Sequence, residues 1–193
     1  MTRETILKNT LRTVMTKEDV DSFLSYEITA SDMLFLKEAV NEVLRKMPAN
    51  AFNCAMLSGL LGAIINDHSN IPVSVISGHL DYSSKRIFNC YKPIPFSTDK
   101  KEINEIWDGH CWVELNNLIV DISIFRTIYY GNVPRDLHDN IVYRFGEGRG
   151  ALVGTPHEIQ KMDFAYTPCY CLTSDQISGL VLGADKLINS NDK

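Results

Sequence analysis

The stretch that decides the fold runs from Gly109 to Ser123 and reads Gly-His-Cys-Trp-Val-Glu-Leu-Asn-Asn-Leu-Ile-Val-Asp-Ile-Ser. Apolar residues alternate with other residues in its first half, and its second half is apolar and β-branched, which predicts two strands. The pair Asn116-Asn117 between them is typical of a two-residue hairpin loop. The sequence therefore predicts an antiparallel hairpin at the centre of the fold.

His110 and Asp121 stand at the open end of this hairpin. With a two-residue loop, Trp112 lies opposite Asp121 and His110 lies opposite Ser123, so His110 and Asp121 become diagonal neighbours on one face. A carboxylate that accepts from one ring nitrogen fixes the imidazole tautomer and leaves the other nitrogen free to take a proton. The pair predicts a general base, and its nucleophile has to come from another part of the chain.

The composition is that of an ordinary globular domain. Of the 193 residues, 45% are hydrophobic and 22% are charged, which is enough for a core without disulfides or metals. The net charge of −5 argues against binding to nucleic acid or to an anionic membrane, because both require a basic patch. We find no internal repeat or linker, and we predict a single domain over residues 1–193.

The cysteines and the N-terminus indicate a reducing compartment. The N-terminal residues lack the apolar core of a signal peptide, and no run of residues is apolar for the length of a membrane span. Five cysteines at irregular spacing fit free thiols better than a disulfide framework: Cys54, Cys90, Cys111, Cys169 and Cys171. We therefore expect a cytoplasmic protein. We expect no metal, because two of these thiols without further ligands do not make a zinc site, and no cofactor.

Apolar spacing predicts helices at residues 2–14, 17–24, 32–47 (capped by Ser31), 54–66 and 174–189. It predicts further strands at 71–79, 86–91, 125–130 and 141–145, a surface loop or short helix at 92–108, and a glycine-rich turn at 146–154. The helix at 54–66 is apolar on nearly every side, so it has to be central. Gly59 and Gly62 each cost about 1 kcal/mol relative to alanine there, which indicates close packing against that face. The fold class is α+β, with N-terminal helices and a central helix on an antiparallel sheet.

Cys54 opens the central helix and is the candidate nucleophile. The unpaired amides and the dipole at a helix N-terminus favour a thiolate, and an imidazolium beside it favours the thiolate further. The same amides, with the side chain of Asn53 or Asn50, are candidates to hold an oxyanion. Cys54 alone fits a packing role, because free cysteine is among the most buried residue types. The combination with His110 and Asp121 is different, since apolar packing requires none of these polar atoms.

The motifs between residues 53 and 123 resemble the transglutaminase-like superfamily of papain-fold cysteine enzymes. The blocks that carry the resemblance occur in the family's order: Asn53-Cys54, Leu60-Leu61-Gly62-Ala63-Ile64-Ile65, Asn70-Ile71-Pro72-Val73-Ser74-Val75-Ile76-Ser77-Gly78, His110-Cys111-Trp112-Val113-Glu114 and Val120-Asp121. The resemblance implies a papain-like fold with Cys54 as nucleophile, His110 as base and then acid, and Asp121 as the group that orients His110. Asn70 stands where the family usually has glycine, and arylamine N-acetyltransferases share the same Cys-His-Asp order, so the substrate stays open.

Two functions of different classes fit these residues. The first is a cysteine-nucleophile enzyme that acts on an amide or ester bond by acyl transfer through a thioester, as a peptidase, amidase or transglutaminase-like enzyme. Its substrate would be a peptide, a protein or a small amide or ester. The second is a protein- or peptide-binding module on the same fold without the chemistry. The intact Cys54, His110 and Asp121 favour the enzyme, and the sequence leaves the oligomeric state open.

Overall fold

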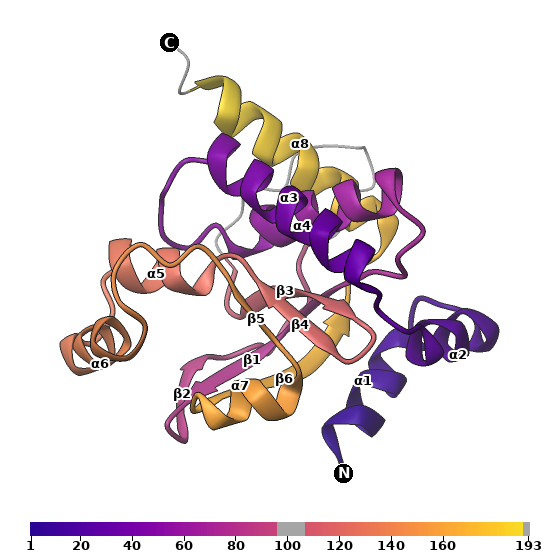
Figure 1. The fold of residues 1–193 in the computed structure, drawn as a ribbon, viewed down its shortest axis with the longest axis horizontal. Coiled ribbons are helices and arrows are strands. Elements are labelled where there is room, and N and C mark those ends of the chain that lie inside the picture. The colour runs from indigo at the N-terminus through magenta and orange to yellow at the C-terminus, as the bar shows by residue number, and fades with distance from the viewer. Residues whose placement is uncertain (96–106, 191–193) are drawn as a thin grey trace.

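A computed structural model of the protein describes residues 1–95 and 107–190, in which eight helices and six strands form an α+β fold (Figure 1). The helices are α1 (Arg3–Leu11), α2 (Lys17–Ser25), α3 (Ala30–Lys46), α4 (Cys54–His68), α5 (Ile124–Tyr130), α6 (Arg135–Phe145), α7 (Pro156–Lys161) and α8 (Ser174–Ser190). The strands are β1 (Ser74–Tyr82), β2 (Lys85–Phe88), β3 (His110–Leu115), β4 (Leu118–Asp121), β5 (Leu152–Gly154) and β6 (Phe164–Cys171). Most of the predicted loop at 92–108 lies outside the described residues.

The described strands form one antiparallel sheet in the order β2-β1-β3-β4-β5, and β6 also pairs with β1. The predicted hairpin is confirmed: Leu115 pairs with Leu118 and Val113 with Val120. Asn116 has a φ of 50°, a conformation that asparagine tolerates in a tight hairpin loop. This register carries His110 and Asp121 to the same end of the sheet.

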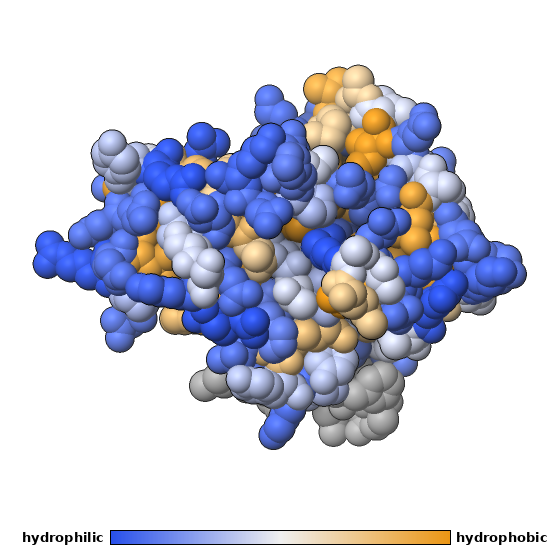
Figure 2. Space-filling model, turned by 90° about the horizontal axis from the view of Figure 1, so that it is seen from below, coloured by the Kyte–Doolittle hydropathy of each residue, from blue (hydrophilic) through white to orange (hydrophobic). Residues whose placement is uncertain are grey.

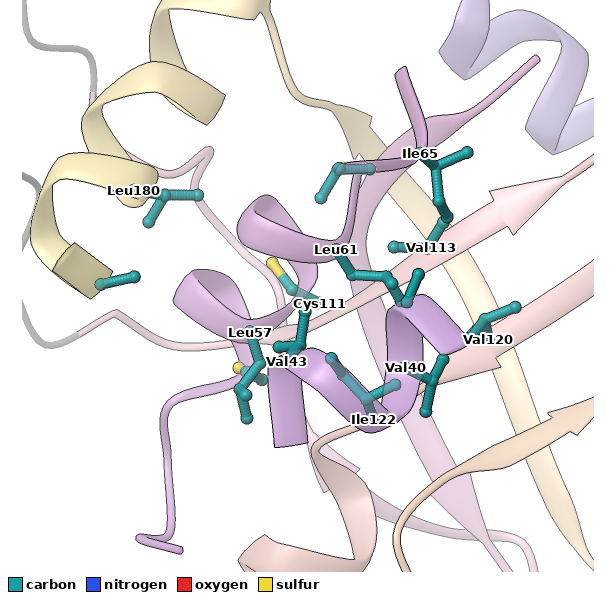
Figure 3. Close-up of a cluster of buried hydrophobic side chains, with 14 of the residues drawn as sticks. Val40, Val43, Leu57, Leu61, Ile65, Cys111, Val113, Val120, Ile122 and Leu180 are labelled. Atoms are coloured by element: carbon teal, nitrogen blue, oxygen red, sulfur yellow. The ribbon is translucent and has the colours of Figure 1, made fainter. Parts of the chain in front are cut away.

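Helices α3, α4 and α8 cover one face of the sheet (Figure 1). Figure 3 shows Leu57, Leu61 and Ile65 of α4 among side chains from α3, α8 and the strands, and all three are fully buried. The predicted central position of this helix on an antiparallel sheet is confirmed. A β-carbon added at Gly59 would lie 3.0 Å from Leu180 Cβ, and one at Gly62 would lie 2.5 Å from Val75 Cγ2. The two glycines therefore let α8 and β1 approach α4 closely, as the sequence indicated.

A second core cluster lies on the opposite face of the sheet and includes residues of α1, α2, α5 and α7. Because both faces are covered, every residue of β3 is buried, including Trp112 and Glu114. The Glu114 carboxylate accepts a hydrogen bond from Trp112 Nε1 at 2.7 Å and forms an ion pair with Arg3 of α1. The Arg3 Nε also donates to the backbone carbonyl of Tyr166 at 3.0 Å, so α1 is joined to both β3 and β6. Seen from below, the surface is mostly hydrophilic, with hydrophobic residues in scattered groups (Figure 2).

Two predicted strands are wrong. Residues 125–130 belong to helix α5, because the side chain of Asp121 accepts from the backbone N–H groups of Ser123 and Ile124 and so satisfies the first amides of a helix. Residues 141–145 belong to helix α6, because Leu137, Ile141 and Phe145 recur every four residues and pack together into the second core cluster.

Several boundaries also differ from the prediction. Helix α3 begins at Ala30, and its cap is Thr29 rather than Ser31: Thr29 and Asp32 exchange side-chain to backbone hydrogen bonds in a capping box. Strand β1 begins at Ser74 rather than at residue 71. The predicted turn at 146–154 contains the short strand β5. Strand β6 and helix α7 were not predicted.

An Arg3→Met substitution tests the ion pair that joins α1 to the sheet. Without the guanidinium, Glu114 keeps a buried carboxylate with one hydrogen bond, and we expect the free energy of unfolding at neutral pH to fall by about 2–3 kcal/mol. Burial already raises the pKa of Glu114, and Arg3 opposes that shift. A carboxyl whose pKa is higher in the folded state than in the unfolded state destabilises the fold when it is ionised. As the pH falls and Glu114 takes up a proton, the stability difference between Arg3→Met and the unsubstituted protein should therefore shrink.

Urea unfolding at about pH 7 and about pH 5 measures this difference. Arg12→Met, at an exposed position just after the same helix, is the matched control and should cost little at either pH. An Arg3→Met loss no larger than that of Arg12→Met would contradict a stabilising role for the ion pair.

Candidate active site

The carboxylate of Asp121, at the end of β4, is the most highly connected side chain of the site. Its Oδ2 lies 2.5 Å from His110 Nε2 and accepts a hydrogen bond from the Tyr166 hydroxyl at 2.7 Å. Its Oδ1 accepts from the Ser123 backbone N–H and hydroxyl at 2.9 Å each and from the Ile124 N–H at 3.0 Å. The side chains of His110 and Asp121 are fully buried. The predicted approach of imidazole to carboxylate is therefore present, and the same carboxylate caps α5.

These contacts shift the pKa values of both groups. Burial alone would raise the pKa of Asp121, but the charge of His110 and the hydrogen bonds from His110, Tyr166 and Ser123 outweigh it and hold the pKa below its usual range. Burial alone would lower the pKa of His110, but the charge and hydrogen bond of Asp121 raise it, with a further contribution from Cys54, to about 10. The buried pair therefore favours an imidazolium beside a carboxylate at neutral pH.

The second ring nitrogen of His110, Nδ1, is buried and makes no hydrogen bond within the described part of the chain. The thiol of Cys54 lies near enough that Cys54 and His110 shift each other's pKa. The two groups are thus neighbours without a well-formed hydrogen bond. Catalytic hydrogen bonds are often long or poorly aligned without substrate and tighten when substrate binds. Nδ1 is the free nitrogen that the sequence predicted for His110.

Cys54 is the first residue of α4, and its pKa lies well below the usual value of a thiol. The neighbouring Cys111 side chain lowers the pKa most. Burial opposes this effect, and the His110 ring together with the Cys111 backbone N–H lowers the pKa further. The amides of the first turn of α4 act in the same direction, because they carry the positive end of the helix dipole. The lowered pKa of Cys54 and the raised pKa of His110 both favour a thiolate beside an imidazolium.

The two asparagines that were candidates for holding an oxyanion lie just before α4. Asn53 occupies the N-cap position, but its side chain makes no capping hydrogen bond. Asn50 is exposed, and its backbone N–H donates to the Pro48 carbonyl at 2.9 Å. The Asn53 side chain therefore accepts no hydrogen bond from the first backbone N–H groups of α4.

A cavity of about 350 Å³ opens beside Cys54. Its walls include four aromatic rings, one carboxylate and the nucleophile candidate: Phe52, Phe88, Tyr91, Trp107, Asp108 and Cys54. The Phe88 ring stacks on His110 with ring centroids 5.0 Å apart. Cys54 is only 8% exposed, and it is one of the residues that line this cavity. This size lies at the lower end of the range for small-molecule sites.

Sequence reasoning missed Tyr166, which holds Asp121 from strand β6. Its hydroxyl binds the same carboxylate oxygen as His110, and its ring packs edge-on against Trp112 with centroids 5.0 Å apart. The signal was the alternation of Phe164 and Tyr166 with smaller residues, which is typical of a strand with one buried face. Pro168 within the same run reduces that signal, because proline cannot donate to a sheet ladder.

Other chemistry has little support in the described residues. Within residues 1–95 and 107–190, no three His, Cys, Asp or Glu side chains come together to hold a metal ion. All five cysteines are free thiols. Burial raises the pKa of Cys90 and of Cys171 to about 12 each and that of Cys111 well above the usual value. None of the described helices is both long enough and apolar enough to cross a membrane.

Comparisons with protein-family models, with curated proteins and with solved structures found no significant match. The interpretation of the site therefore rests on its own geometry and chemistry.

The pH dependence of thiol alkylation tests the state of Cys54. A thiol with an ordinary pKa loses thiolate about tenfold for each pH unit below about 8.5. Because the pKa of Cys54 is lowered, its rate of reaction with iodoacetamide should fall much less steeply than that between about pH 8 and about pH 6. Peptide mapping of alkylated protein at each pH measures the rate at every cysteine separately.

Free N-acetylcysteine, alkylated under the same conditions, is the reference for an ordinary thiol. A His110→Ala variant should raise the pKa of Cys54 and restore a steep pH dependence. If the Cys54 rate in the unsubstituted protein falls in parallel with that of N-acetylcysteine, Cys54 is an ordinary thiol.

Proposed function

We propose that this protein is a cysteine-nucleophile enzyme that cleaves or exchanges an amide or ester bond through a thioester on Cys54. The observation that carries the proposal is the buried ring of His110, which binds Asp121 through Nε2 and leaves Nδ1 unpaired near the Cys54 thiol. A buried polar atom without a partner lowers stability, so a packing role gives no reason for it. A group that exchanges a proton with a neighbouring nucleophile does give a reason.

We further propose that the α+β fold is of the papain-like, transglutaminase-like type. The resemblance of residues 53–123 to that superfamily supports this assignment. The order of the elements also supports it, since a helix that begins with Cys54 packs on an antiparallel sheet whose strands carry His110 and Asp121. On this reading, Asp121 orients His110, and Tyr166 and Ser123 hold Asp121 in place.

The proposed acylation begins with a thiolate and an imidazolium. The Cys54 sulfur attacks the carbonyl carbon and forms a carbon–sulfur bond, and the negative charge moves to the carbonyl oxygen. Backbone N–H groups at the start of α4, with Asn53 or Asn50 as further donors, would stabilise this oxyanion. When the bond to the leaving group breaks, His110 gives its proton to the leaving amine or alkoxide. The products of this half-reaction are a thioester on Cys54 and a neutral His110 that is still bound to Asp121.

The second half-reaction releases the acyl group. Water or an amine attacks the thioester while His110 removes its proton, and the carbon–sulfur bond then breaks to return Cys54 as a thiolate. Water as acceptor gives hydrolysis, and an amine gives transfer. Both outcomes restore the imidazolium–thiolate pair, so one arrangement of residues serves either reaction.

Trapping of the acyl group tests the proposed function. The protein is incubated with activated small esters and with a peptide library, in the presence and absence of a primary amine, and intact mass spectrometry with peptide mapping locates any adduct. We expect an acyl adduct on Cys54 that water or the amine removes. Cys54→Ala should abolish the adduct and leave the fold intact, because alanine keeps the helix propensity. Cys171→Ala, which also removes a buried cysteine, is the matched control and should retain activity.

Asp121→Asn tests the role of the carboxylate. An asparagine has one side-chain oxygen, so it cannot accept from both the α5 amides and His110. An NH₂ group facing His110 Nε2 would reverse the ring tautomer, and turnover should fall on the order of 10²- to 10⁴-fold, as in the serine-protease case. In that orientation the buried Tyr166 hydroxyl also loses its acceptor, which should lower the melting temperature.

Turnover per folded molecule separates the two effects, so both quantities are measured on the same sample. Normal turnover in the folded fraction would remove Asp121 from the mechanism. If neither esters nor peptides acylate Cys54 but peptides bind, the protein is a binding module on this fold.

A further inference from the structure

Four aromatic rings line the cavity beside Cys54. Phe52 lies in the loop before α4, and Phe88, Tyr91 and Trp107 lie in the segments before and after residues 96–106. We call this space the aromatic cleft. Its lining in the described part of the chain contains one carboxylate, Asp108, and no lysine or arginine. The cleft therefore offers apolar ring surface to a ligand and no positive side chain to an anion.

Phe52 is held in a backbone conformation that large side chains rarely adopt. Its φ is 64°, and its side chain is 60% exposed although it is aromatic. A β-carbon added at Gly131 would lie 3.2 Å from Phe52 Cζ, so the edge of the ring rests against the end of α5. Bulky residues at positive φ are strained, and such strain is concentrated at functional sites. Packing of the Phe52 ring into the core does not explain the strained backbone, because most of the side chain is exposed.

Trp107 and Tyr91, which also line the cleft, are held by hydrogen bonds and close packing. Trp107 Nε1 donates to the Lys92 carbonyl at 2.9 Å. The Trp107 ring lies against Gly109, where an added β-carbon would approach it to 2.4 Å, and Gly109 has a φ of 123°. The Tyr91 hydroxyl donates to Asn89 Oδ1 at 3.0 Å, and the Tyr91 side chain is 69% exposed. These rings hold their positions without a ligand, so little ordering would accompany binding.

We propose that the aromatic cleft selects the acyl donor, and that the preferred donor carries an aromatic side chain next to the carbonyl that Cys54 attacks. This inference rests on the proposed function. Ring-to-ring contact supplies the selectivity, because aromatic pairs stabilise a complex beyond the area they bury. Asp108 and the Cys54 thiolate are both negative and face the same cleft, so an acidic side chain at that position is disfavoured.

Three irreversible probes test the proposal: N-acetyl-phenylalanine, N-acetyl-alanine and N-acetyl-glutamate fluoromethyl ketones. They share the electrophile and differ only in the side chain. Labelling of Cys54 is followed by intact mass and peptide mapping, and iodoacetamide, which has no side chain to place, reports the nucleophile alone. We expect the phenylalanine probe to label Cys54 at least about tenfold faster than the alanine probe. The glutamate probe should be slower than the alanine probe.

Phe52→Ala should bring the phenylalanine-probe rate close to the alanine-probe rate when each is divided by the iodoacetamide rate of the same variant. Tyr91→Ala is a second variant in the cleft lining and keeps the test independent of any effect on the start of α4. Tyr143→Ala removes an aromatic side chain that is 91% exposed on α6 and should change none of the rates.

The outcomes separate the two proposals. Equal rates for the three probes, or a preference for glutamate, with normal iodoacetamide labelling of Cys54, would overturn the selectivity and leave the proposed function standing. Retention of the phenylalanine preference in both Phe52→Ala and Tyr91→Ala would also overturn it. If iodoacetamide itself does not favour Cys54, the proposed function fails.

Discussion

The hydrogen bonds of one carboxylate, that of Asp121, hold the site together. Its two oxygens accept from four neighbours, His110 of β3, Tyr166 of β6 and the adjoining Ser123 and Ile124, where α5 begins. A buried charge is tolerated only when it is paired and hydrogen-bonded, and here the partners come from β3, from β6 and from the start of α5. The position of His110 therefore depends on the pairing of the sheet and on the direction of α5.

The site is a buried row of ionisable groups that begins with Asp121 and continues through His110 to Cys54. Each group shifts the next one toward its ionised form: Asp121 raises the pKa of His110, and His110 contributes to the low pKa of Cys54. The sheet carries Asp121 and His110, and α4 carries Cys54, so the row crosses from the sheet to the helix layer. The packing of α4 on β1 and β3, with Gly62 at the close contact to Val75 of β1, places the thiol beside the imidazole.

Much of this arrangement could be predicted from local sequence. The two-residue loop at Asn116 fixed the hairpin register, and the apolar α4 had to be central. Residues 125–130 were mistaken for a strand because β-branched and aromatic residues favour strands, and the local contacts of the Asp121 side chain with the amides two and three residues later were overlooked. Tyr166 was missed for a different reason: pairing of β6 with β1, far away in sequence, places its hydroxyl on Asp121. The arrangement of thiol, imidazole and cleft likewise depends on contacts between distant segments.

The protonation state of His110 tests the central claim most directly, and nitrogen-15 NMR of its ring measures it without substrate. In protein labelled at histidine nitrogens, the account predicts an imidazolium at neutral pH that titrates at about 10. In Cys54→Ala the same ring should titrate at lower pH, because the thiolate no longer stabilises its charge, while the hydrogen bond to Asp121 remains. A neutral His110 ring at pH 7 that titrates near the ordinary value of about 6.5, unchanged by Cys54→Ala, would contradict the account.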